Sequence, residues 1–171
     1  MIWFWYFLLY SFIGFLLEVL FAWITGGHPR RKCLLLLPLC PVYGLGACLI
    51  LGTTGHFTHP LLLFCVGAVL STACEYIMAT FYEEVLLVSF WDYSDLPLNL
   101  HGRVCLPFAL VWGGLTALAV RWVQPMVERL AEQTVPEVTY LCLLVFAADA
   151  LCSLRILQVR KDPEALRADV E

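Results

Sequence analysis

MIWFWYFLLYSFIGFLLEVLFAWIT, residues 1–25, is an apolar and aromatic run that contains one charged residue, Glu18. A helix of about 17–25 such residues crosses the roughly 30 Å hydrocarbon core of a bilayer. The run has no basic residue before its apolar part and no small-residue cleavage site after it, unlike a secretory signal peptide. We therefore predict a first transmembrane helix over residues 3–24.

Four further stretches of the chain are almost free of charge. Residues 33–54 and 104–120 have no Asp, Glu, Lys or Arg. The other two stretches contain one acidic residue each, Glu75 and Asp149. The chain is 61% hydrophobic and 14% charged, against about 45–50% and about 25% in soluble domains. We predict an all-α, polytopic integral membrane protein. Its single transmembrane domain, residues 1–171, has spans at 3–24, 33–54, 60–82, 104–121 and 138–154 and a charged tail at 158–171.

The second stretch is interrupted by two prolines, Pro38 and Pro41. Each proline removes a backbone donor and clashes with the preceding helical turn. A regular helix is therefore expected to begin near Pro41, which leaves too few residues to span a bilayer. Three arrangements stay open: residues 34–39 cross as part of a broken helix, the whole segment is re-entrant, or the helix only kinks.

Lys and Arg are distributed unevenly between the two ends of these spans. With five spans, one end carries Arg30, Arg31, Lys32, Arg103, Arg155, Arg160, Lys161 and Arg167, and the other carries Arg121 and Arg129. The positive-inside rule then predicts an external N-terminus and a cytoplasmic C-terminus, in the cell (inner) membrane. A re-entrant second segment would invert the last three spans and remove this asymmetry.

The cysteines and histidines do not indicate a metal or redox site. The cysteines lie mostly in apolar stretches without a C-x-x-C pair, which is typical of buried apolar residues. We predict neither a disulfide framework nor a metal site, since His56 and His59 also lack the glutamate of an H-E-x-x-H helix.

The chain has no signature of nucleotide or nucleic-acid binding. It contains no G-x-x-x-x-G-K-[ST] motif and no basic stripe. We predict no cofactor and no nucleic-acid partner, and ATP-driven transport would need a separate ATPase subunit.

Three acidic residues lie inside predicted spans that run in the same direction. Glu18, Glu75 and Asp149 each lie about 0.7 of the way along their spans, which predicts one layer nearer the cytoplasm. A carboxylate at this depth costs at least ~2.5 kcal/mol, so it is expected to face the bundle interior and mark a pathway, a relay or a pocket. Alternatively, each is neutral or hydrogen-bonded to a neighbouring helix. Small or hydroxyl residues at helical spacing accompany Glu18 and Glu75, which favours the inward face.

SFWDYSDLPLNLHGRVC, residues 89–105, is the longest stretch that is not apolar. Arg103 begins the fourth span from this loop, and its guanidinium offers a planar fork to a carboxylate or phosphate. We predict that it binds an anionic group beside Glu75. Alternatively, Arg103 pairs with Asp92 and the aromatic residues anchor the helix ends.

The runs SFIGFLLEVLF, PLCPVYGLGA, CEYIMATFYEE and WDYSDLPLNLHGRVC resemble the CmpB-type ABC transporter permease family, over about residues 3–125. The resemblance implies a multi-pass membrane protein that takes part in transport. It also implies a polar signature made of Glu18, Tyr43, Glu75, Trp91, Asp92, Tyr93, Ser94, Asn99, Gly102 and Arg103.

Three functions remain open from the sequence. The first is a permease-like transport component, with a separate ATPase or as a homo-oligomer in the lipid bilayer. Its polar, acidic pocket near the cytoplasmic leaflet would bind a polar or anionic small molecule or lipid headgroup, or couple protons. The predicted binding residues are Glu18, Tyr43, Glu75, Asp92, Tyr93, Asn99 and Arg103.

The second possible function is that of a membrane enzyme that acts on a lipid headgroup, with Glu75 or Asp92 as acid or base. The third is a structural or accessory subunit.

Overall fold

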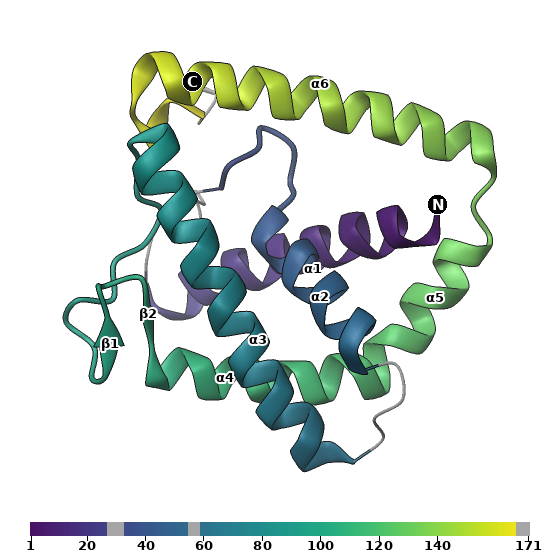
Figure 1. The fold of residues 1–171 in the computed structure, drawn as a ribbon. Helices are drawn as coiled ribbons and strands as arrows, with labels where there is room; N and C mark the ends of the chain where they lie inside the picture. Colours follow the sequence, from purple (N-terminus) through teal and green to yellow (C-terminus); the bar gives the residue numbers. More distant parts are fainter. Residues whose placement is uncertain (27–32, 55–58, 167–171) are drawn as a thin grey trace.

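The computed structural model describes residues 1–26, 33–54 and 59–166 (Figure 1). Several residues used above, namely Arg30, Arg31, Lys32, His56 and Arg167, lie outside the described residues.

The described residues form six α-helices and one short hairpin. The helices are α1 (Ile2–Ile24), α2 (Pro41–Thr54), α3 (Pro60–Phe81), α4 (Leu106–Leu118), α5 (Gln124–Glu132) and α6 (Pro136–Arg160). A π-helical turn at Tyr82–Leu86 extends α3, a second at Ala119–Val123 joins α4 to α5, and a 3-10 turn covers Pro163–Leu166. The hairpin pairs β1 (Asn99–Leu100) with β2 (Val104–Cys105) in antiparallel orientation.

Four helical stretches are long and apolar enough to cross a membrane. They are Ile2–Ile24, Pro60–Leu86, Leu106–Glu132 and Pro136–Arg160. In Figure 1, α1 and α6 both begin at the right and run to the left, while α4 runs the opposite way. The prediction of an all-α, multi-pass membrane protein is confirmed.

The second segment crosses the molecule with a non-helical first half. Its helix, α2, begins at Pro41, as predicted, and has 14 residues. Gly44 of α2 lies against Phe7 and Ser11, and the Cys48 thiol donates to the Trp3 carbonyl at 3.7 Å. Thus α2 runs antiparallel to α1, from the middle of α1 to its beginning. Leu34 packs near the opposite end, against the cluster that contains Leu86 and Leu157. The segment is thus a non-helical stretch followed by a short helix, and not one kinked helix.

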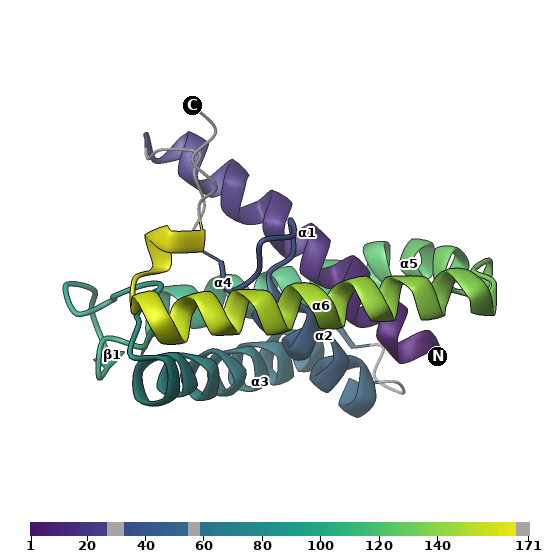
Figure 2. The ribbon, with the colours of Figure 1, turned by 90° about the horizontal axis from the view of Figure 1, so that it is seen from above.

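Residues 33–40 lie between α1 and α6, which diverge toward their C-terminal ends (Figure 2). Non-helical backbone at membrane depth must be satisfied by the protein. Here the Leu36 N–H donates to Ser153 Oγ at 3.1 Å, and the Leu37 N–H donates to Asp149 Oδ2 at 3.3 Å. The Cys40 N–H donates to the Ser11 carbonyl at 2.9 Å.

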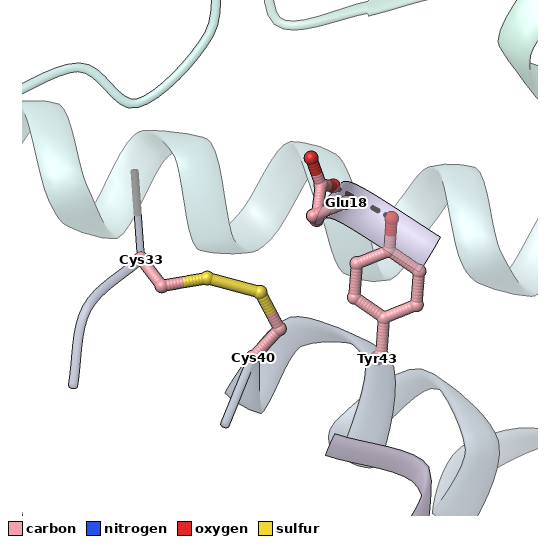
Figure 3. The surroundings of a disulfide bond; sticks show 4 residues. All are labelled: Glu18, Cys33, Cys40 and Tyr43. Atoms are coloured by element: carbon pink, nitrogen blue, oxygen red, sulfur yellow. Dashed lines mark hydrogen bonds between the residues drawn. A yellow bond between two sulfur atoms is a disulfide. The ribbon is translucent and has the colours of Figure 1, made fainter. Parts of the chain in front are cut away.

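A disulfide joins Cys33 to Cys40 (Figure 3), so the prediction of no disulfide framework is wrong for this pair of cysteines. The two Cα atoms are 5.9 Å apart, whereas seven residues of α-helix would separate them by roughly 10 Å along the axis. The pairing depends on the non-helical path of this segment, which residue spacing alone does not reveal.

The core has a cluster at each end of the bundle, with close helix packing between them. Tyr6 and Tyr10 of α1 pack with Val127 and Ala131 of α5. The other cluster contains Tyr82, Leu86, Val88, Leu157 and Leu166. Between them α3 and α4 approach closely, because a Cβ on Gly113 would come within 2.7 Å of the Phe64 carbonyl oxygen. This contact sets the position of α4 relative to Glu75.

Candidate functional site

Glu75 is a buried carboxylate at the contact between α3 and α4. The residue is 6% exposed, and its face of α3 also buries Gly67 and Ala79. Each carboxylate oxygen accepts one hydrogen bond: Oε1 from the Tyr93 hydroxyl and Oε2 from Trp112 Nε1, both at 3.0 Å. Buried charge is tolerated only when it is hydrogen-bonded or paired. The loop and α4 therefore both contribute a donor to this one side chain.

Glu18 lies on α1 and accepts a 2.7 Å hydrogen bond from the hydroxyl of Tyr43 (Figure 3). Gly14 leaves the space for Tyr43, since a Cβ at Gly14 would overlap the phenol ring. The Tyr43 ring in turn contacts Trp112, which donates to Glu75. The first and third spans thus bring two acidic groups together.

Four aromatic rings connect the two carboxylates. The Tyr43 ring meets Trp112 edge to face, with centroids 5.3 Å apart. Phe108 lies 6.4 Å from Trp112 and stacks on Tyr93 at 4.7 Å. We call the set of six residues the Glu18–Glu75 site; it consists of Glu18, Tyr43, Glu75, Tyr93, Phe108 and Trp112.

Tyr93 is the member of this site that comes from the loop. Burial, and then the nearby charge of Glu75, raise the pKa of the Tyr93 phenol above its ordinary value. The phenol therefore stays protonated and acts as a hydrogen-bond donor to Glu75. Its backbone N–H donates to the Gly102 carbonyl at 2.7 Å, which ties Tyr93 to the hairpin.

Arg103 forms an ion pair with Glu83 at the end of the third span. Its Nε and Nη2 atoms lie 2.8 and 2.7 Å from Glu83 Oε2. Its Nη1 atom donates to the Tyr76 hydroxyl at 3.2 Å and to Thr80 Oγ1 at 3.0 Å. The hydrogen bond that Arg103 donates to Glu83 raises the pKa of Arg103 further. The expected alternative pair of Arg103 with Asp92 is wrong, because Glu83, on the π-helical turn that extends α3, lies within reach of Arg103 instead.

Asp92 and Asn99 hydrogen-bond within the loop itself. Asp92 Oδ1 accepts from the Ser94 N–H at 2.9 Å and from the Ser94 hydroxyl at 2.6 Å, which lowers the pKa of Asp92. Asn99 Nδ2 donates to the Ser94 and Leu96 carbonyls, and its Oδ1 accepts from the Gly102 N–H. The structure therefore groups Asp92 and Asn99 with each other and not with Glu75.

Asp149 faces the protein but contacts the second segment, through the Leu37 N–H. All three intramembrane carboxylates thus have hydrogen-bond partners on other segments, as the inward-facing prediction requires. Only Glu18 and Glu75 are linked by the aromatic rings.

Sequence reasoning missed two residues of the Glu18–Glu75 site, Phe108 and Trp112. It also missed the three side chains that Arg103 contacts, Tyr76, Thr80 and Glu83. Tyr76, Thr80 and Glu83 recur at steps of four and three, which places them on one face of a helix. That spacing could have identified Glu83 as the partner of a cation. No comparable signal marks Trp112, whose role depends on the packing of α4 against α3.

Two other features are separate from the Glu18–Glu75 site. A shallow surface hollow is lined by Ala79, Tyr82, Ser89, Phe90 and Trp91. Within the described ranges, no group of three or more His, Cys, Asp or Glu side chains is arranged to hold a metal ion.

Comparison with known proteins gives one family. The sequence model of the family described as "Putative ABC-transporter type IV" matches residues 5–154. The match includes most of α6, so it extends beyond the resemblance noted from the sequence. No curated protein and no solved structure matches the chain.

Proposed function

Because the chain belongs to this ABC-transporter type IV family, we propose that it is a membrane-spanning transport component whose Glu18–Glu75 site binds the transported species. The same carboxylates exchange protons with both sides of the membrane, so that the chain conducts protons without a partner. The observation that carries the proposal is Glu75, a carboxylate 6% exposed within an apolar span and hydrogen-bonded from both the loop and α4.

A purely structural role does not require these carboxylates. The helices α3 and α4 already approach closely at Gly67 and Gly113. Two interacting carboxylates in a membrane protein add a desolvation cost and mutual repulsion. Intramembrane acidic residues with such a cost are typical of substrate paths and proton relays.

The site supports a proton, a cation or a hydrogen-bond donor better than an anion. Among the described residues, Arg103 brings a guanidinium to this part of the protein, and it is already engaged by Glu83, Tyr76 and Thr80. An anionic solute or a lipid phosphate would have to displace Glu83. The lipid-enzyme alternative has less support as well, because Asp92 is engaged by Ser94.

The proposal includes an ATPase as a separate chain. The family name refers to ABC transporters, and the sequence contains no P-loop motif. ATP hydrolysis would therefore be supplied by a partner subunit. In the bilayer, that subunit would act on one copy of this chain or on a homo-oligomer of it.

We propose that the C-terminus lies in the cytoplasm, because Lys and Arg are concentrated on the same side of the predicted spans as the C-terminus. Disulfides are typical of oxidising compartments, but Cys40 is 3% exposed and is shielded from soluble reductants. A C-terminal reporter that is active only in the cytoplasm tests the orientation. Activity only outside the cytoplasm would overturn it.

The proposed function can be tested with purified protein in liposomes that contain a pH-sensitive dye. A potassium diffusion potential, negative inside, is applied with valinomycin. We expect wild-type liposomes to acidify, and Glu75→Gln to slow the acidification at least tenfold. The matched control is Asp149→Asn, because an asparagine oxygen still accepts the Leu37 N–H; its rate should stay within twofold of wild type.

Glu18→Gln provides a second variant should Glu75→Gln fold poorly, because a glutamine oxygen still accepts the Tyr43 hydroxyl. We expect its flux to fall at least fivefold. Equal flux in all variants, or no flux above protein-free liposomes, would overturn the proposed function.

A further inference from the structure

The Glu18–Glu75 site combines two carboxylates with a continuous group of aromatic rings. The rings of Tyr43, Trp112, Phe108 and Tyr93 follow one another at centroid distances of 5.3, 6.4 and 4.7 Å. Two of these residues also donate directly to Glu75, and Tyr43 donates to Glu18. Negative charge and π-systems are therefore presented together at one place in the membrane.

The four aromatic residues are half-buried, and Glu75 is buried at 6% exposure. Each ring residue thus keeps part of its surface accessible. Phe108 also meets Phe21 of α1, at 6.0 Å, so aromatic surface continues toward the end of the first span. Aromatic side chains also donate hydrogen bonds to both carboxylates.

The combination of two carboxylates with four aromatic rings favours one class of cation over another. A small metal ion prefers a shell of several oxygen ligands and is costly to dehydrate. Here Tyr43, Tyr93 and Trp112 already donate to three of the carboxylate oxygens. A cation with apolar substituents needs few oxygen ligands and is attracted by the faces of aromatic rings.

We propose that the Glu18–Glu75 site binds an organic cation, such as a substituted ammonium or phosphonium ion. Its charge is balanced by the carboxylates of Glu18 and Glu75. Its apolar substituents contact the rings of Tyr43, Tyr93, Phe108 and Trp112. This inference rests on the proposed function, which assigns the transported species to the same site, and adds the chemical class of that species.

Two ions of the same shape and opposite charge test the proposal. Tetraphenylphosphonium and tetraphenylborate are each measured by equilibrium dialysis against the purified full chain in detergent, with protein-free detergent as background. We expect saturable binding of tetraphenylphosphonium and no saturable binding of tetraphenylborate. Glu75→Gln and Glu18→Gln should each weaken binding of the cation at least tenfold, while Asp149→Asn changes it less than twofold.

A pair of variants at Trp112 separates the aromatic contribution from simple hydrophobic contact. Trp112→Phe keeps an aromatic ring and loses the N–H donor, so the affinity should fall less than threefold. Trp112→Leu keeps an apolar side chain without a ring, so the affinity should fall at least tenfold. Thermal melting of each variant shows that the comparison is made on folded protein.

The proposal is overturned if tetraphenylborate binds as well as tetraphenylphosphonium, if both glutamine variants bind like wild type, or if Trp112→Leu binds like Trp112→Phe. Proton flux in liposomes is measured on the same preparations. Flux that still depends on Glu75, without cation binding, would refute the organic cation and leave the proposed function standing. Loss of the dependence on Glu75 would refute both.

Discussion

The hydroxyl of Tyr93 donates a hydrogen bond to Glu75 Oε1 at 3.0 Å. Tyr93 belongs to the loop between the third and fourth spans, and Glu75 belongs to the apolar part of the third span. This contact brings the polar loop of residues 89–105 to a carboxylate that is 6% exposed. The hairpin and the ion pair of Arg103 with Glu83 hold the loop in the position from which Tyr93 reaches Glu75.

Tyr93→Phe should leave the ring stacked on Phe108 and remove only the donor to Glu75. We expect a loss of about 1 kcal/mol in unfolding free energy, the usual contribution of one hydrogen bond. Proton flux in liposomes should change at least threefold, because Glu75 loses one of its two donors. Tyr140→Phe is the matched control, since Tyr140 is 64% exposed on α6, and its flux should equal that of wild type. Equal flux in both variants would show that Tyr93 does not act on the site.

Arg103→Ala should lower the melting temperature, because it leaves Glu83 without its cation. Adding Glu83→Gln should restore part of the loss, whereas adding Asp92→Asn should not. Thermal melting of the two double variants in detergent makes the comparison. Better rescue by Asp92→Asn than by Glu83→Gln would contradict the pairing seen in the structure.

Gly102 has φ +68, and a Cβ there would lie 2.7 Å from Asp92 Oδ1 and 2.6 Å from Ser94 Oγ. Gly102→Ala should therefore destabilise the loop by about 1–3 kcal/mol and displace Tyr93, whose N–H donates to the Gly102 carbonyl. Limited proteolysis of the loop measures the effect. Gly114→Ala is the control, since no atom lies within 4 Å of the Cβ position. Identical cleavage of the two variants would argue against this loop geometry.

The Cys33–Cys40 disulfide can be mapped by alkylation and mass spectrometry in a denaturing detergent. We expect these two cysteines to be alkylated only after reduction, whereas Cys48, Cys65, Cys74, Cys105, Cys142 and Cys152 are alkylated at once. Cys33→Ser with Cys40→Ser should lower the unfolding free energy by about 2 kcal/mol, the chain-entropy estimate for a short loop. Alkylation of Cys33 and Cys40 without reduction would refute the pairing.

The sequence was sufficient to predict the features that depend on a single helix. Uninterrupted apolar runs predicted the long spans, and the proline at position 41 predicted where α2 begins, because both follow from local chain chemistry. The partners of Arg103, Glu75 and Cys33 depend on how segments pack against one another. Asp92 is nearer to Arg103 in sequence than Glu83 is. In space, however, Glu83 lies next to Arg103 because β2 packs near the end of α3. Trp112 was missed for the same reason.

The most direct test of the central claim is the modification of Glu75 by dicyclohexylcarbodiimide, a lipid-soluble reagent that reacts with protonated carboxyl groups in apolar surroundings. Peptide mass spectrometry measures modification at Glu75 and Asp149, and proton flux is measured on the same liposomes. We predict that Glu75 is modified and that flux falls in proportion to this modification, whatever happens at Asp149. Complete modification of Glu75 with unchanged flux, or loss of flux with Glu75 unmodified, would contradict the assignment of Glu75 to the transport site.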